Sequence, residues 1–288
     1  MIEIGWIAST TWHELLTPEL LVVGGVLALL YAQVGNGYSD AQGGFVRLPR
    51  SRQACFYTGL LLLYASYGSV LAALADEAID VYVLQVCLRY LAMVPLLLTG
   101  LPDRWRAGLL ARLPGLRSGD PGDRAGLLAT LVLFAGLAAS LVPDLYNFLA
   151  VMVPLRLLLH AVLLLSSCVM WAYLLRRVPA AADSAAAAGA PVGARRGRHQ
   201  LYKLLALGSA VLFPACLLMM SSGYAAYQHP LHLADAGVCL APGFEAPQLA
   251  YRAGSTSTYG GLVLLVMQQL AFAVAIGLGG RRRRRQMT

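Results

Sequence analysis

Residues 154–177 read PLRLLLHAVLLLSSCVMWAYLLRR, an apolar run closed by two arginines. The run exceeds the roughly 20 residues that a helix needs to cross a hydrocarbon core of about 30 Å. Arg156 and His160 interrupt it four residues apart, which places both side chains on one face of a helix. Because a charged group in lipid is costly, the stretch predicts both a membrane helix and a polar site within it.

The rest of the chain has the same apolar character. Hydrophobic residues make up 58% of the 288 residues and charged residues 12%, whereas soluble domains hold roughly 25% charged residues. The formal net charge is +8, but the basic residues form short clusters between apolar runs. That pattern is typical of membrane topology, so the composition predicts an integral membrane protein and excludes a nucleic-acid partner.

Seven apolar runs predict an all-α, polytopic membrane helix bundle. They cover about residues 18–34, 53–75, 81–101, 125–142, 149–175, 200–227 and 258–280. A stretch rich in Ala and Gly, about 179–197, predicts a flexible cytoplasmic linker. We therefore expect one integral-membrane domain over residues 1–280, with a short N-terminal segment lying at the membrane interface, and a basic cytoplasmic tail over 281–288.

The charges predict the orientation of this bundle. Basic residues fall in alternate loops, around 47–52, 104–124, 176–203 and 281–285, and only Arg252 falls in the other set. Nine acidic residues lie in the other set: Glu3, Glu14, Glu19, Asp76, Glu77, Asp80, Asp144, Asp235 and Glu245. Because positively charged loops stay in the cytoplasm, the N-terminus is predicted outside and the C-terminus inside.

Polar residues occur in two of the predicted spans. Tyr82, Gln85 and Arg89 follow an i, i+3, i+7 pattern on the third span, with Arg89 roughly 13 Å into the membrane. On the fifth span Arg156 is predicted near the outer boundary and His160 one turn deeper. Packing these two faces together would shield them from lipid, so the five residues predict a buried polar cluster or a partner-binding surface.

Each of these side chains has alternative roles. Apart from Glu19 at the start of the first predicted span, no predicted span contains an Asp or Glu that could pair with Arg89. Its partners are therefore backbone carbonyls, Gln85, Tyr82, water, or the carboxylate of a partner protein, cofactor or lipid, and we adopt the carboxylate as the hypothesis. Arg156 either joins the cluster or extends to the outer headgroups.

His160 is either a structural histidine or a ligand of copper(I), which favours imidazole with soft sulfur from Cys and Met. His229 and His232, in the loop after the sixth span, are a second metal candidate. The sequence holds no Ser-His-Asp set, no HExxH and no P-loop. We therefore expect no enzyme activity.

Three passages carry a family resemblance. They are Tyr82-Val-Leu-Gln85-Val86 through Pro95-Leu-Leu-Leu-Thr-Gly100-Leu-Pro102, then Pro143-Asp-Leu-Tyr146 through Arg156-Leu-Leu-Leu-His160 to Met170-Trp171, and Thr256-Ser-Thr-Tyr-Gly260-Gly261-Leu. Their order along the chain resembles the CtaG family of cytochrome c oxidase assembly factors, which are seven-span bacterial proteins. The resemblance covers about Pro18 to Gly280.

The polar signature of that family is largely replaced here. Tyr82 and Val86 stand where the family has histidines, Arg156 replaces one of a pair of histidines, and His160 remains. Thr256 and Ser257 stand where the family has acidic and amide residues.

The resemblance implies a multi-pass protein of the bacterial inner membrane that assists assembly of a haem-copper respiratory oxidase or stays bound to it. Its partners would be oxidase subunits or other membrane proteins, together with the lipid bilayer. The alternative is a membrane copper-handling protein that uses His160 with Cys and Met ligands. The cofactor is left open, with copper ahead of haem.

Overall fold

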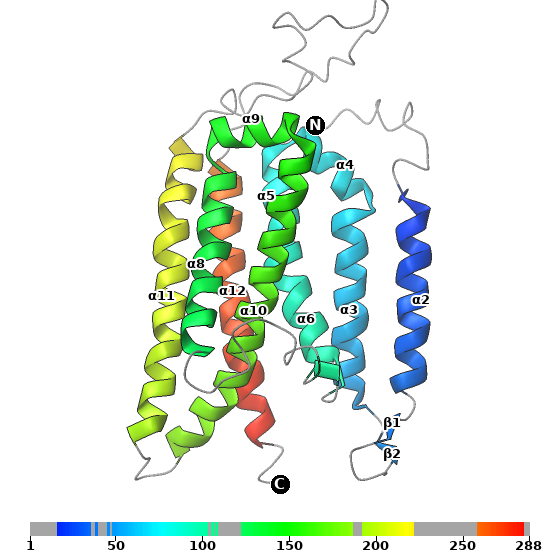
Figure 1. Ribbon diagram of the computed structural model, residues 1–288, viewed down its shortest axis with the longest axis vertical. Coiled ribbons are helices and arrows are strands. Elements are labelled where there is room, and N and C mark those ends of the chain that lie inside the picture. Colours follow the sequence, from blue (N-terminus) through cyan, green and yellow to red (C-terminus); the bar gives the residue numbers. More distant parts are fainter. Residues whose placement is uncertain are drawn as a thin grey trace, which may run out of the picture.

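Long helices stand side by side in the computed structural model of the chain (Figure 1). It describes residues 16–35, 38–39, 45–46, 48–102, 105–106, 108, 122–186, 192–221 and 258–284. The elements are α2 (Pro18–Gly35), β1 (Tyr38–Ser39), β2 (Phe45–Val46), α3 (Arg50–Tyr67), α4 (Val70–Glu77), α5 (Ile79–Cys87), the π-helical η2 (Leu88–Met93), α6 (Val94–Gly100), α8 (Gly122–Ser140), α9 (Pro143–Val151), α10 (Val153–Ala186), α11 (Val192–Ser221) and α12 (Thr258–Arg284). The all-α prediction is confirmed, since the two short antiparallel strands are the only other regular structure within the described ranges.

The predicted third span is one rod with a change of helical register. The segments α5, η2 and α6 follow one another without a gap, and η2 contains Arg89 and ends two residues before Pro95. In a π-helix each carbonyl faces the N–H five residues further on. The carbonyl of Tyr90 therefore faces Pro95, which has no N–H to donate.

The predicted second span, 53–75, is wrong as a single helix. The helix α3 ends at Tyr67, and α4 starts at Val70 after Gly68 and Ser69. The hydroxyl of Ser69 accepts a hydrogen bond from the N–H of Leu71 at 3.1 Å and so caps α4. This break leaves carbonyls at the end of α3 without helical partners.

The region between the fourth and sixth spans also differs from the prediction. Pro143 begins a separate helix, α9, which lies at 87° to α8 and crosses the end of the bundle (Figure 1). The helix α10 then starts at Val153 instead of about 149. It continues to Ala186, and α11 begins at Val192. The predicted linker, 179–197, is thus largely helical.

The core lies between α5, α8, α10, α11 and α12. Its largest fully buried side chains include Trp171, Phe134 and Tyr90. The carboxylate of Asp80, at the start of α5, accepts a hydrogen bond from the N–H of Gly260 at 3.1 Å. The starts of α5 and α12 therefore lie at the same end of the bundle.

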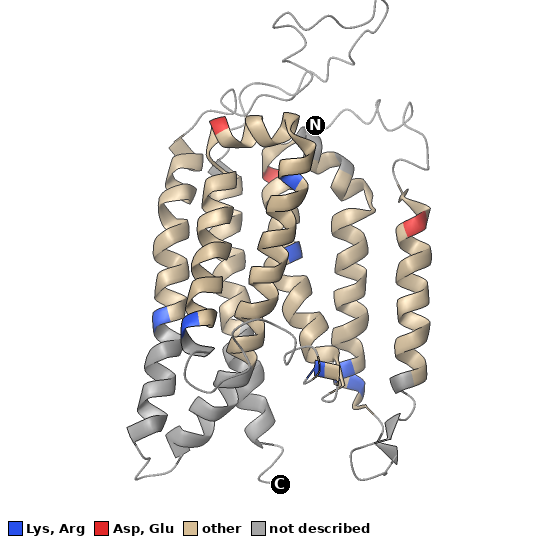
Figure 2. Cartoon of the chain, in the orientation of Figure 1, with Lys and Arg blue, Asp and Glu red and all other residues tan. Residues whose placement is uncertain are grey.

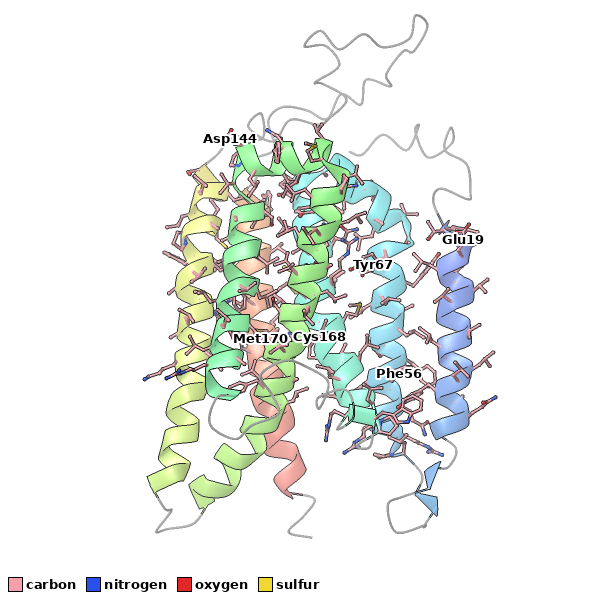
Figure 3. The ribbon with its side chains drawn as sticks, viewed as in Figure 1. Glu19, Phe56, Tyr67, Asp144, Cys168 and Met170 are labelled. Carbon is pink, nitrogen blue, oxygen red and sulfur yellow. The ribbon has the colours of Figure 1, made fainter. Side chains whose placement is uncertain are left out.

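The helix α2 stands at the edge, against α3. Its side chains are mostly exposed, including Val22 and Leu29, and Tyr31 anchors it. The Tyr31 hydroxyl donates to the carbonyl of Gly100 at 2.7 Å, and its ring stacks on Phe56 with centroids 3.7 Å apart. Figure 3 places Phe56 near one end of α3 and Tyr67 near the other.

Acidic and basic residues of the described part concentrate at opposite ends of the bundle. In Figure 2 the acidic residues of the described part lie at the upper end, and most of the basic residues lie towards the lower end. Figure 3 places Glu19 and Asp144 at that upper end.

By length and composition, three helices of the described part can cross a membrane: Ile79–Gly100, Val153–Leu175 and Lys203–Ser221. A fourth crossing is added if Arg124–Ser140 and Pro143–Val151, bent by 87°, count as one. Pro18–Gln33 and Tyr259–Ala273 are shorter apolar helices. The chain is therefore a helical membrane protein, and the count of seven spans and the orientation stay predictions.

Candidate functional site

The break between α3 and α4 supplies the partner of Arg89. In an unbroken helix the carbonyl of Ser66 would accept from the N–H of residue 70. Here it accepts instead from Arg89, through Nε at 3.1 Å and Nη2 at 2.5 Å, and from Gln85 Nε2 at 2.8 Å. The guanidinium also lies 3.9 Å from the ring centroid of Tyr67.

These contacts hold a charge inside the bundle. Arg89 is 8% exposed, and its neighbours are a carbonyl dipole and the electron-rich face of a ring, both of which stabilise a cation. Among the partners expected for Arg89, the structure shows the backbone carbonyl. The carboxylate of another molecule stays a prediction.

His160 lies in a second polar group, between the third span and α10. The Tyr90 hydroxyl is 2.7 Å from Nδ1 of His160, and the tautomer of the ring decides which of the two donates. The Tyr82 ring lies 6.5 Å from the imidazole and 5.4 Å from the ring of Tyr146 on α9, measured between centroids. The imidazole of His160 therefore lies beside the phenol rings of Tyr82 and Tyr90.

The predicted polar stripe thus divides between two neighbours. Tyr82 faces His160 of α10, whereas Gln85 and Arg89 face α3. Arg156 is half-buried one turn before His160, and its N–H bonds to the carbonyl of Met152 at 3.0 Å. The cluster consequently makes two sets of contacts, one with α3 through Arg89 and one with α10 through Tyr90, and Arg156 lies one turn from the second.

The Tyr90 carbonyl, left without a helical donor by Pro95, joins the rod to α10. It accepts from Ser167 Oγ at 2.7 Å and from Trp171 Nε1 at 2.9 Å. Both donors are fully buried and lie four residues apart, on one face of α10. The sequence interpretation did not assign this contact or the Ser66 carbonyl, although Pro95 and the Gly68-Ser69 pair signalled where the helices change.

A copper site at His160 stays a prediction. Within the ranges that the structure describes, no three His, Cys, Asp or Glu side chains are placed to bind a metal together. His229 and His232 lie outside the described residues. The described polar contact of the His160 imidazole is the Tyr90 hydroxyl.

One comparison with known proteins decides the family. The family model described as cytochrome c oxidase caa3 assembly factor (CtaG) matches residues 29–286, nearly the whole chain. The chain belongs to this family. No curated protein and no solved structure matches it. For this caa3 assembly factor family member, the resemblance inferred from the three sequence passages is confirmed, and both polar groups fall within the matched range.

Replacing Tyr90 by phenylalanine tests the second polar group. The change removes the hydroxyl beside His160 and keeps the ring, so we expect the unfolding free energy to fall by about 1 kcal/mol. The imidazole should also react faster with diethyl pyrocarbonate, as measured by mass spectrometry of the purified protein. Tyr57→Phe, on an exposed tyrosine of α3, is the control. Equal reactivity of His160 in both variants would contradict the assigned hydrogen bond.

Proposed function

We propose that this protein assists the assembly of a haem-copper respiratory oxidase, or stays bound to it, in the bacterial inner membrane, and that it is not an enzyme. The observation that carries the proposal is the family match over residues 29–286. The helical membrane bundle supports it, because such a protein meets its partners within the bilayer.

The proposed topology has seven spans, namely α2, α3, the α5–η2–α6 rod, α8, α10, α11 and α12. The ends of these helices support it. Described acidic residues at one end are Glu19, Asp80 and Asp144, and described basic residues at the other are Arg50, Arg52, Arg106, Arg124 and Lys203. With the basic end in the cytoplasm, the N-terminus lies outside and the C-terminus inside.

The proposed partner surface lies in the outer half of the membrane, where α10 leaves α9. Leu155, Leu157 and Leu158 are exposed there, and half-buried Arg156 lies among them. An arginine in an apolar membrane face suits a partner that offers a carboxylate or a carbonyl. Behind this surface His160 contacts Tyr90 of the third span, and the adjacent Arg89 binds the Ser66 carbonyl of α3.

The test is purification of the tagged full chain in mild detergent. We expect oxidase subunits to co-purify, and cells lacking the chain to show less haem-copper oxidase in difference spectra of their membranes. Arg156→Leu should lower the co-purified oxidase at least roughly fivefold, as for a residue central to an interface. Arg124→Leu, an exposed arginine at the opposite end, is the matched control.

Either of two results would refute the proposal: a full oxidase spectrum in cells lacking the chain, or equal loss of partner in Arg156→Leu and Arg124→Leu.

The second candidate function is copper handling through His160. The observation that favours copper handling is the contact of Tyr90 with Nδ1 of His160. Such a contact fixes the orientation of the ring and so of Nε2, as hydrogen-bond partners of metal-bound histidines do. Stoichiometric copper in the purified protein, lost in His160→Ala, would select copper handling instead.

A further inference from the structure

The helix α12 presents a regular exposed stripe. Its members are spaced alternately three and four residues apart: Tyr259, Leu262, Val266, Gln269 and Ala273, all exposed. Such spacing is that of the seam by which two helices pack along their length. Four of the five residues are compatible with lipid, but Gln269 is not an apolar residue.

Gln269 contacts the neighbouring helix with part of its amide. Its Nε2 donates to Ser209 Oγ on α11 at 3.1 Å. An amide group has two N–H donors and a carbonyl that accepts, so this bond leaves one N–H and Oε1 for another partner. Gln269 lies eleven residues after Thr258, roughly 16 Å along the helix, which places it near the middle of the membrane if α12 spans it.

Lipid tails offer no group that could bond to this amide. The missing partner must both accept from the remaining N–H and donate to Oε1, at the same depth. Another Gln269 does both. Two α12 helices related by a two-fold axis along the membrane normal would exchange reciprocal Nε2–H···Oε1 bonds, with the apolar stripe residues packed above and below.

We propose that the protein forms a parallel dimer through α12, with Gln269 of each copy hydrogen-bonded to Gln269 of the other. A single polar residue in an apolar seam fixes the register and the number of helices. The proposal rests on the placement of α12 across the membrane and is independent of the role in oxidase assembly.

The adjacent residue provides a matched control. Gln268, about 100° further around α12, is fully buried, and within the described part of the chain neither amide atom has a hydrogen-bond partner. The substitutions Gln268→Leu and Gln269→Leu are therefore chemically identical, but only the second changes the exposed stripe.

The experiment is sedimentation velocity of the purified full chain in mild detergent, over a range of protein concentrations. We expect a dimer for the wild type and for Gln268→Leu, and dimerisation weaker by on the order of tenfold to a hundredfold for Gln269→Leu. Val266→Trp, which adds bulk to the stripe without touching the amide, should weaken the dimer as well. Far-UV circular dichroism confirms that each variant keeps its helices.

A wild type that stays monomeric at all concentrations overturns the proposal. So does a dimer that Gln269→Leu and Val266→Trp leave intact, because another surface would then hold it. Equal weakening by Gln268→Leu and Gln269→Leu also overturns it. None of these results changes the expectation that oxidase subunits co-purify, so the two proposals fail separately.

Discussion

Replacing Gly100 by alanine is expected to lower the unfolding free energy by about 3 kcal/mol or more. A Cβ atom at this position would lie 2.6 Å from Cβ of Phe56, 2.7 Å from its backbone N and 2.8 Å from its Cα. Since two of these atoms belong to the backbone of α3, no side-chain rotation relieves the contact. The two helices must separate, and the carbonyl of Gly100 then moves away from the Tyr31 hydroxyl that anchors α2.

The measurement is the thermal midpoint of the purified protein in detergent, followed by size-exclusion chromatography after heating. Gly25→Ala in α2 is the control, because a Cβ there meets nothing within 4 Å. Alanine favours a helix by up to about 1 kcal/mol over glycine, so this variant should be equal to the wild type or more stable. A Gly100→Ala protein as stable as Gly25→Ala would refute the close approach of α3 and α6.

The positions of the long helices could be predicted because apolar length alone determines them. The first expected helix, 18–34, and the last, 258–280, agree with α2 and α12 at their starts, and the structure continues α12 to Arg284. What hydropathy could not show is where an apolar run changes direction. Gly68 and Ser69 interrupt one predicted span within a mostly apolar run, and α9 is a helix where the sequence predicts the loop between the fourth and fifth spans.

The candidate site was predictable in its residues and not in its contacts. Gln85, Arg89 and His160 stood out because polar side chains in a membrane span need partners. Two of these partners are a carbonyl freed by a helix break and the hydroxyl of Tyr90. A backbone carbonyl carries no sequence signal of its own, and the distance along the chain from Ser66 to Arg89 hides the pairing further.

Removing both hydrogen-bond donors to the Tyr90 carbonyl should lower the unfolding free energy by at least as much as Gly100→Ala does. Ser167→Ala and Trp171→Phe each remove one hydrogen bond and leave the other, so each alone should lower the unfolding free energy by about 1 to 2 kcal/mol. Together they leave a carbonyl without any donor in the fully buried centre of the bundle. Such a group costs about a further 1 to 3 kcal/mol, so the double variant should lose about 5 kcal/mol, more than the sum of the two single losses.

This non-additivity is what distinguishes a shared carbonyl from two unrelated packing defects. The thermal midpoints of wild type, both single variants and the double variant in detergent give the coupling, and Ser166→Ala, on the neighbouring buried serine, is the control. Additive losses would mean that the two side chains do not share one acceptor. Because Tyr90 also contacts His160 on α10, while Arg89 beside it contacts Ser66 on α3, a π-helical segment freed from α10 would displace both polar groups. We therefore expect the double variant, if it still reaches the membrane, to lose co-purified oxidase along with its stability.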